Sequence, residues 1–279
     1  FAQGMRELML VVKVPKDAID IVGTGGDGSN SFNISTVSAL VVASCGVKVA
    51  KHGNRAASSK CGSADVLEAL GVDILLTPQK AQTVLQKAGF VFLFAPQFHP
   101  AMKIVGPVRR ELKIRTIFNY LGPFLNPAKV QRMLLGVANL ELAKKFLSIA
   151  RKLNFEHLLI VTSVDGMDEI SVASETHAFE LKESRVKEFI IDPKKLGFKK
   201  YFKSALAGGE PKLNAQIVRD ILSGKDGAKK DATILNSAYA LLVAGRVKDV
   251  REGIKLAIQA IESGKSFKLL EQFIKETNK

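Results

Sequence analysis

The chain has 279 residues, of which 47% are apolar and 24% are charged. These values exclude a wholly disordered chain, a collagen-like chain and a disulfide scaffold, and the length allows one large domain or two modest ones. The 41 lysines and arginines exceed the 27 acidic residues, and the resulting net charge of +14 indicates a polyanionic partner, anionic small substrates or a lysine-rich solvated surface.

The cysteines and the hydropathy predict the cellular setting. Cys45 and Cys61 form no CxxC pair, which argues against a zinc site and a disulfide framework and for a reducing compartment. No apolar run reaches the ~18 residues that a membrane span requires, and no signal peptide is recognised. We therefore expect a cytoplasmic protein without membrane contact. The first residue is Phe1 rather than methionine, which indicates a fragment or a processed chain.

Short apolar runs alternate with helical patterns along the chain. In the first part, we predict strands at 20–22, 47–50 and 90–94 and helices at 35–44, 63–70, 77–88 and 99–112. In the second part, we predict strands at 133–137, 158–161 and 169–172, a helix at 141–152, a hairpin of 176–181 and 185–191, and mostly helix from 203 onward. This alternation predicts an α/β fold with a mostly parallel central sheet flanked by helices.

A glycine-rich loop, Gly23-Thr24-Gly25-Gly26-Asp27-Gly28, follows the first predicted strand. Formally it contains the dinucleotide fingerprint G-x-G-x-x-G, but about five residues separate its last glycine from the helix, and the next strand carries lysines where that fingerprint requires a carboxylate. A Walker A lysine is also missing from the sequence after the glycines. The remaining interpretations are a plain glycine turn before a capped helix, or an anion site built from backbone N–H groups and a helix N-terminus.

Hydroxyl groups and a second polar loop strengthen the anion-site interpretation. Ser35 and Thr36 open the helix after the glycine loop, and the Ser35 hydroxyl is suited to ligate Mg²⁺ as well. The second loop, Lys51-His52-Gly53-Asn54-Arg55-Ala56-Ala57-Ser58-Ser59, follows the second predicted strand and runs through Gly62 into a helix that starts at Ser63. Two such loops at one edge of a parallel sheet indicate a ligand with separated phosphate groups.

Carboxylates and one arginine complete the candidate site. Asp168 and Glu169 follow a glycine turn, and such a pair is either a solvated surface feature or, beside phosphates, a set of Mg²⁺ ligands. Arg109 lies ten residues after His99, about three helical turns, and is either a surface residue or a bidentate partner for a carboxylate. His52 and His99 are interpreted as packing or hydrogen-bonding residues, and no Ser-His-Asp or Cys-His arrangement indicates covalent catalysis.

The motifs together resemble those of one family. In order along the chain, GTGGDG, NIST, KHGNRAASS, GSADVLEALG, FAPQFHPAM, IRTIFN, LGPFLNP and DGMDEIS resemble the motifs of the anthranilate phosphoribosyltransferases. The resemblance is dense over residues 18–170 and continues loosely to 245. It implies transfer of the phosphoribosyl group of 5-phosphoribosyl 1-pyrophosphate to the amine of anthranilate, with release of pyrophosphate, in tryptophan biosynthesis.

The resemblance also implies a role for each matched residue, without assigning any residue as an acid or base. The donor would be bound by Gly23, Gly26, Asp27, Ser31, Asn33, Ile34, Ser35, Thr36, Lys51, His52, Gly53, Asn54, Arg55, Ala56, Ala57, Ser58, Ser59 and Ser63. Anthranilate would be bound by Asn54, Pro96, His99, Arg109 and Gly122. Of two Mg²⁺ ions, one would be held by Ser35 and the other by Asp168 and Glu169.

The family pattern implies two domains and a homodimer. Residues 19–96 and 126–279 would form the α/β domain that binds the donor, and residues 1–18 and 97–125 would be the remnant of a small helical domain. Family members carry further helices before the position of Phe1, and those helices build most of the small domain and much of the dimer contact. Ser31, Met102 and Lys113 depart from the usual family residues, which bears on substrate affinity more than on the reaction.

Two alternatives remain at this point. A pyrimidine nucleoside phosphorylase shares the fold but lacks the second loop in this form. A nucleic-acid-binding relative without transferase activity would account for the charge, because residues 182–203 contain eight lysines and arginines against three acidic residues. The intact donor and anthranilate motifs argue against a nucleic-acid partner and in favour of the enzyme.

Overall fold

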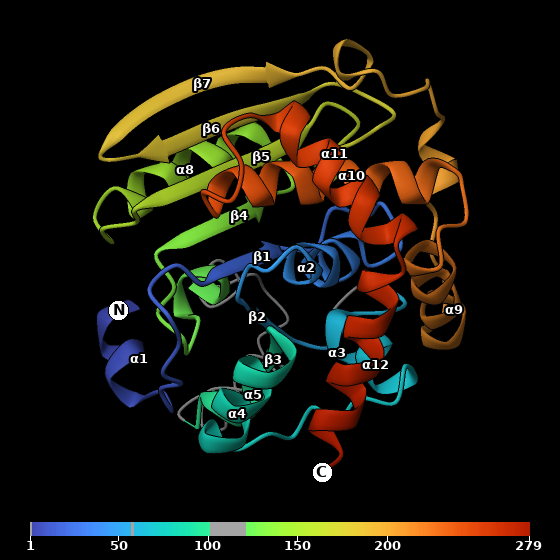
Figure 1. Ribbon diagram of the computed structural model, residues 1–279. Coiled ribbons are helices and arrows are strands. Elements are labelled where there is room, and N and C mark those ends of the chain that lie inside the picture. The colour runs from blue at the N-terminus through green and yellow to red at the C-terminus, as the bar shows by residue number, and fades with distance from the viewer. Residues whose placement is uncertain (1, 57–58, 101–120) are drawn as a thin grey trace.

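A computed structural model of the chain describes residues 2–56, 59–100 and 121–279. Within these ranges, seven strands form one sheet in the order β3-β2-β1-β4-β5-β6-β7, which Figure 1 shows from the lower strands to β7 at the top. The strands are β1 (Ile19–Gly23), β2 (Val49–Gly53), β3 (Phe90–Phe94), β4 (Arg132–Gly136), β5 (His157–Ser163), β6 (Thr176–Lys182) and β7 (Arg185–Ile191). Strands β1 to β5 pair in parallel and the β6–β7 hairpin is antiparallel, so the predicted fold class is confirmed.

The burial of the strands follows from their place in the sheet. All five residues of β3 and all seven of β5 are buried, as expected for strands with both faces covered. β7 forms the edge of the sheet and is largely exposed; its charged side chains, among them Arg185 and Lys187, oppose pairing with another sheet edge.

The chain reverses its direction across the sheet between β1 and β4. From β1 it moves outward to β2 and β3, and after β4 it moves the opposite way to β5, β6 and β7. Gly23 and Gly136 are paired at the carboxyl ends of these two central strands. In doubly wound α/β folds the ligand binds in the crevice at such a switch point, so the topology itself predicts a binding site beside these glycines.

Helices cover the sheet and are delimited by caps. They are α1 (Ala2–Leu8), α2 (Ile34–Ser44), α3 (Ser63–Ala69), α4 (Pro78–Ala88), α5 (Ala95–Phe98), α8 (Leu140–Ala150), α9 (Pro211–Leu222), α10 (Ala228–Val243), α11 (Val250–Glu262) and α12 (Lys265–Thr277). α4 begins where the Thr77 hydroxyl accepts the Lys80 N–H at 3.2 Å, and it ends at Gly89, whose φ of 79° is left-handed. α2 is buried from Ile34 to Ala43 because α10 and α12 pack over it. No helix within the described ranges is long and apolar enough to cross a membrane.

One predicted element is wrong, and a second is wrong at its start. Residues 169–172 form a loop instead of a strand, because side chains satisfy the backbone there: Asn236 binds both the N–H and the C=O of Ile170, at 3.0 and 2.8 Å. His99 does not start a helix. It follows the short α5, and Pro100 after it disfavours the helical conformation, in keeping with the His99 φ of −120° and ψ of 74°. The rest of the predicted helix 99–112 lies outside the described residues.

The second strand begins two residues later and ends three residues later than predicted. Lys51, His52 and Gly53, which the sequence places in a loop, belong to β2, because their backbones pair with β3 as far as Gly53 opposite Phe94. The predicted division into two domains remains a prediction. A bond from Arg6 Nε to the carbonyl oxygen of Phe124, at 3.0 Å, shows that residues from the two segments of the expected small domain contact each other.

A substitution at the switch point tests this close packing. In Gly136→Ala the new Cβ would overlap the backbone carbonyl oxygen of Asp168, which cannot move freely. We expect a loss of about 1–3 kcal/mol or more in the free energy of unfolding, measured by urea denaturation. Gly4→Ala is the control, because nothing lies within 4 Å of that position. Equal stability of the two variants would contradict the assigned packing.

Candidate active site

The glycine loop turns tightly at the carboxyl end of β1. Gly25, Gly26 and Gly28 have φ values of 67°, 75° and 70°, a region that favours glycine. The turn leaves the Gly25 N–H directed at Asp168 Oδ2, at 2.6 Å, and the Thr24 N–H bound to the carbonyl oxygen of Gly136 at 3.0 Å. The loop therefore lies directly against the carboxylate segment, although 143 residues separate the two in the sequence.

Hydroxyl and amide groups join the two predicted loops. Thr36 Oγ1 donates to Ser63 Oγ at 3.2 Å, and Asn33 Nδ2 donates to the carbonyl oxygen of Cys61 at 3.1 Å. Because Asn33 and Ser63 stand at the beginnings of α2 and α3, these bonds bring two helix N-termini together. The predicted convergence of the two loops at one edge of the sheet is confirmed for these residues.

A buried lysine lies beneath the site. Lys51 lies in β2. Its Nζ donates to the carbonyl oxygen of Ile21 in the neighbouring strand β1 at 2.5 Å and to Ser35 Oγ at 3.2 Å. Burial lowers the pKa of Lys51, and the neighbouring carboxylates of Asp20, Glu169 and Asp168 offset only part of this lowering. The ammonium group is therefore placed as the counter-charge of the carboxylate cluster.

Three carboxylates meet opposite Lys51. The Asp168 N–H donates to Asp27 Oδ2 at 3.3 Å, and the side chains of Asp168 and Glu169 are buried. Burial and then the charge of Asp27 raise the pKa of Asp168 to about 7. Burial and then Asp168 raise the pKa of Glu169 well above its usual range, against the opposing effects of Lys51 and then of the Ser35 N–H. Such crowding of like charges favours the binding of a cation.

The donor atoms of this cluster fit Mg²⁺. Carboxylate and hydroxyl oxygens are the hard ligands that Mg²⁺ prefers, and proteins usually supply only one or two carboxylates while substrate phosphates and water complete the shell. The oxygen donors present suit an ion that is shared with a phosphate. In the described part of the chain, no group of three or more His, Cys, Asp or Glu side chains is arranged to hold a metal ion.

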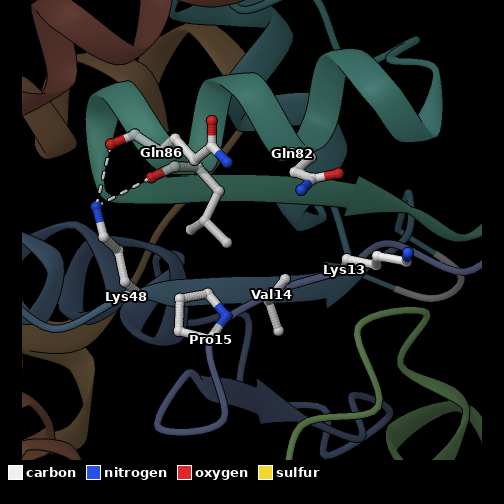
Figure 2. A pocket seen from close by; sticks show the side chains of 7 residues that line it. Lys13, Val14, Pro15, Lys48, Gln82 and Gln86 are labelled. Carbon is white, nitrogen blue, oxygen red and sulfur yellow. Dashed lines mark hydrogen bonds between the residues drawn. The ribbon is translucent and has the colours of Figure 1, made fainter.

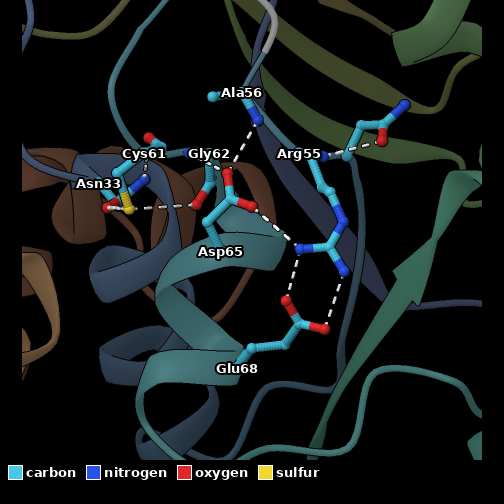
Figure 3. A network of polar contacts seen from close by, with 8 residues as sticks. Asn33, Arg55, Ala56, Cys61, Gly62, Asp65 and Glu68 are labelled. Atoms are coloured by element: carbon cyan, nitrogen blue, oxygen red, sulfur yellow. Dashed lines mark hydrogen bonds and ion pairs between the residues drawn. The ribbon is translucent and has the colours of Figure 1, made fainter. Parts of the chain in front are cut away.

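The second loop is anchored to α3. Asp65 Oδ2 accepts the backbone N–H groups of Ala56 and Gly62, at 2.9 and 2.8 Å. Arg55 extends along α3, and its guanidinium contacts the carboxylates of Glu68 and Asp65, as Figure 3 shows. Ala57 and Ser58 lie outside the described residues, while Ser59 is exposed.

The predicted anthranilate residues are brought together in part. His52 Nδ1 donates to the carbonyl oxygen of Gly122 at 3.2 Å, and the rings of His52 and His99 lie 5.2 Å apart. Burial, reinforced by His99, lowers the pKa of His52 to about 3, and burial also lowers the pKa of His99. Both rings are therefore neutral at pH 7, which supports their interpretation as packing residues. Pro96 lies one turn earlier in α5, and Arg109 lies outside the described residues.

The sequence analysis did not identify two asparagines that stabilise the loops of the site. Asn214 of α9 donates to Asn33 Oδ1 at 2.9 Å and accepts the Gly209 N–H at 2.8 Å, and Asn236 of α10 holds Ile170 next to Glu169. These asparagines are buried in the helical C-terminal part of the chain, far in sequence from any motif. The Gly208-Gly209 pair before α9 is the one signal in the sequence of this close approach, since a Cβ on Gly208 would meet Phe32 and Asn214 at 2.8 Å.

A surface cleft lies away from this site. It is lined by Lys13, Val14, Pro15, Lys48, Gln82, Leu85 and Gln86 (Figure 2). Lys48 precedes β2, so the cleft lies at the amino ends of the strands, whereas the glycine loops lie at the carboxyl ends. The ammonium group of Lys48 is already bonded to the carbonyl oxygens of Leu85 and Gln86, at 3.3 and 3.1 Å, where it caps α4.

Known proteins resemble this chain over almost its whole length. The family described as glycosyl transferase family, a/b domain, matches residues 15–267. The anthranilate phosphoribosyltransferase of Methanobrevibacter smithii is 49% identical over 276 residues, which cover 99% of this chain and 82% of that protein. The chain belongs to the anthranilate phosphoribosyltransferase family. This assignment decides against the pyrimidine nucleoside phosphorylase alternative.

Solved structures of anthranilate phosphoribosyltransferases share the fold. The enzyme of Thermus thermophilus superposes with a TM-score of 0.93 at 40% identity and covers 100% of this chain and 83% of its own. The enzyme of Saccharomyces cerevisiae, in complex with PRPP and Mg, gives a TM-score of 0.91 at 33% identity and covers 99% of this chain and 78% of its own. The family resemblance inferred from the motifs is thus confirmed by sequence and by structure.

The low pKa of His52 predicts a pH dependence of stability. An unfolded chain protonates His52 below pH 6.5, whereas the folded chain resists protonation down to about 3. Stability from this group is therefore complete above pH 6.5 and falls by about 1.4 kcal/mol per pH unit below it. We expect the free energy of unfolding of the wild type to lose about 2 kcal/mol more than that of His52→Asn between pH 7 and pH 5.

The comparison with the variant isolates this histidine. An asparagine side chain does not titrate, and its amide is shaped to keep the bond to Gly122, so His52→Asn removes the titration alone. Buried carboxylates with raised pKa values, such as Asp20, act in the opposite direction in both proteins and cancel in the difference. Identical pH slopes in denaturant titrations would show that His52 is not buried as described.

Proposed function

We propose that this chain transfers the phosphoribosyl group of 5-phosphoribosyl 1-pyrophosphate to the amine of anthranilate and releases pyrophosphate. The observation that carries the proposal is the meeting of the glycine loop, Lys51 and the cluster of Asp27, Asp168 and Glu169 at the switch point of the sheet. In a chain of this family, that arrangement offers backbone donors for phosphate next to carboxylates that require a cation.

The donor would be held mainly by backbone N–H groups and hydroxyls. The glycine turn and the first turn of α2 present N–H groups to an anion, and the helix dipole adds a partial positive charge. Of the residues named from the resemblance, those of the glycine loop, the Asn33–Thr36 segment and Ser63 surround this point. Thr36 and Ser63 are linked by a hydrogen bond, and they would bind neighbouring oxygens of the same ligand.

The metal would be held at two places. Ser35 Oγ would be a ligand of one Mg²⁺ ion, and Asp168 and Glu169 would hold the other. Bound Mg²⁺ neutralises the charge that develops on departing pyrophosphate. Lys51 donates to Ser35 Oγ and occupies one lone pair of this oxygen, so the other lone pair is left for a metal ion.

Anthranilate would be bound by Asn54, Pro96, His99, Arg109 and Gly122. Its aromatic amine is a sufficient nucleophile without a strong base, and His52 and His99 are neutral and buried, so no side chain is assigned as an acid or base. We propose that the chain accelerates the reaction by positioning the two substrates and by stabilising an oxocarbenium-like transition state and its leaving group. The expected two domains, the homodimer and the cytoplasmic location belong to the same proposal.

A direct assay tests the function. Anthranilate fluorescence should decrease in time when the chain is mixed with the donor and Mg²⁺, and pyrophosphate should appear in equal amount. A parallel titration with DNA at low and high salt tests the nucleic-acid alternative, which predicts salt-dependent binding. Unchanged fluorescence with folded protein would overturn the proposal for this chain.

Removing the metal carboxylates should abolish turnover. We expect Asp168→Asn combined with Glu169→Gln to lower kcat by at least about a hundredfold, since the charge on the leaving group is then not neutralised. The dependence of the initial rate on Mg²⁺ concentration measures the effect. Glu175→Gln, on an exposed loop residue nearby in sequence, is the control and should leave the rate unchanged. Wild-type activity of the double variant would refute the metal assignment.

Replacing Arg109 should weaken the binding of anthranilate. Arg109→Ala loses a charge-assisted fork to the anthranilate carboxylate, of about 1.5–3 kcal/mol. We expect KM for anthranilate to increase by about ten- to a hundredfold, while KM for the donor changes little. Steady-state kinetics with each substrate varied in turn distinguishes these effects. An unaltered KM and kcat for anthranilate would exclude the role.

A further inference from the structure

Arg55 is held by α3 rather than directed freely into the donor site. Its Nη1 and Nη2 donate to the two carboxylate oxygens of Glu68 at 2.5 and 2.8 Å, and Nη1 also donates to Asp65 Oδ1 at 3.1 Å. The guanidinium carbon lies 5.4 Å from the centre of the Phe94 ring. Figure 3 shows the fork between Arg55 and Glu68 across the first turns of α3.

We propose that Arg55 is a positioning residue whose guanidinium, through Glu68 and Asp65, locks the second loop onto α3 and thereby places Asn54 and Ser63 for the donor. This inference rests on the proposed function, and it changes the part of Arg55 in it: the resemblance assigns Arg55 to the donor itself. In the proposed arrangement the arginine acts through the loop backbone and does not touch the phosphates.

The charges around Arg55 argue against a phosphate contact. Two carboxylates share one guanidinium, so the group as a whole is negative and a poor partner for a polyanionic donor. The bidentate geometry with Glu68 uses the planar fork for which arginine is suited. The hydrogen bond to Glu68 raises the pKa of Arg55. Partial burial raises the pKa of Asp65, but the hydrogen bonds that it accepts outweigh burial and lower that pKa below its usual value.

Asp65 connects Arg55 to the backbone of the second loop. Its Oδ2 accepts the N–H groups of Ala56 and Gly62, which close the loop at both ends, while its Oδ1 accepts from Arg55. The two ends approach so closely that a Cβ on Gly62 would overlap the backbone nitrogen of Ala56. One carboxylate therefore fixes the loop backbone and the arginine together.

The contact of Arg55 with α3 affects two residues of the proposed site, Asn54 and Ser63. The Asn54 carbonyl oxygen accepts the Ala64 N–H at 3.2 Å, and Asn54 Oδ1 accepts the Arg55 N–H at 2.8 Å. Ser63, next to Ala64, is bonded to Thr36. Releasing Arg55 from α3 would loosen the strand-to-helix connection between Asn54 and Ser63 without removing any group that meets the donor.

A double-mutant cycle on donor binding tests the proposal. Arg55→Ala, Glu68→Ala and their combination are titrated with the donor and Mg²⁺ by calorimetry. We expect each single variant to raise Kd by about tenfold and the double variant to be no worse than Arg55→Ala, because both substitutions break the same pair of Arg55 and Glu68. Lys60→Ala removes an exposed charge from the same loop and is expected to leave Kd unchanged.

The opposite pattern would overturn the lock. If Arg55 contacts the phosphates, Glu68→Ala leaves donor binding unchanged or improves it, and the effects of the two substitutions add. Hydrogen exchange of the Ala56 and Gly62 amides is a second readout that does not require any substrate. Both amides should exchange faster in Arg55→Ala and in Glu68→Ala, and unchanged exchange would contradict the proposal. A wild-type chain that binds no donor would instead overturn the proposed function, while hydrogen exchange still decides on the lock.

Discussion

Buried charge at the centre of the sheet is the constraint on which the site depends. Lys51 is enclosed below the site together with the carboxylates of Asp20, Asp168 and Glu169. Buried charges are tolerated only when they are paired and hydrogen-bonded. One ammonium group cannot balance three carboxylates. Burial raises the pKa of Asp20 to about 6, and burial together with the charge of Asp27 raises the pKa of Asp168 to about 7. A cation bound beside these carboxylates would therefore stabilise the folded chain.

Polar side chains from distant elements keep this arrangement in place. Asn126 bridges Asp20 Oδ2 and the carbonyl oxygen of Ala50, at 2.7 and 2.8 Å, and so ties β1 to β2 beneath the site. Asn236 binds the backbone of Ile170 beside Glu169, and Asp65 binds the backbone of the second loop. In each case an amide or carboxylate side chain pairs with backbone groups that irregular structure leaves unpaired. These bonds hold the loops in one defined conformation.

Much of the fold and part of the site could be predicted from local sequence. The strands at β1, β3 and the β6–β7 hairpin and the helix α4 were predicted close to their observed bounds, because apolar runs, caps and turn residues act locally. The strand expected at 169–172 was wrong because Asn236, which decides the conformation there, comes from α10. The helix expected from His99 was wrong at its start because α5 and Pro100 take that position.

The sequence by itself determined the family and the α/β class, and it supplied the residue types proposed for the phosphate and metal sites, since motifs and periodicities are properties of neighbouring residues. Only the tertiary structure decided which of them meet. It placed Asp168 on the Gly25 N–H, Lys51 on Ser35, and Arg55 on Glu68. The physical reason is that burial and electrostatic pairing depend on contacts between segments far apart in the chain, which no local pattern encodes.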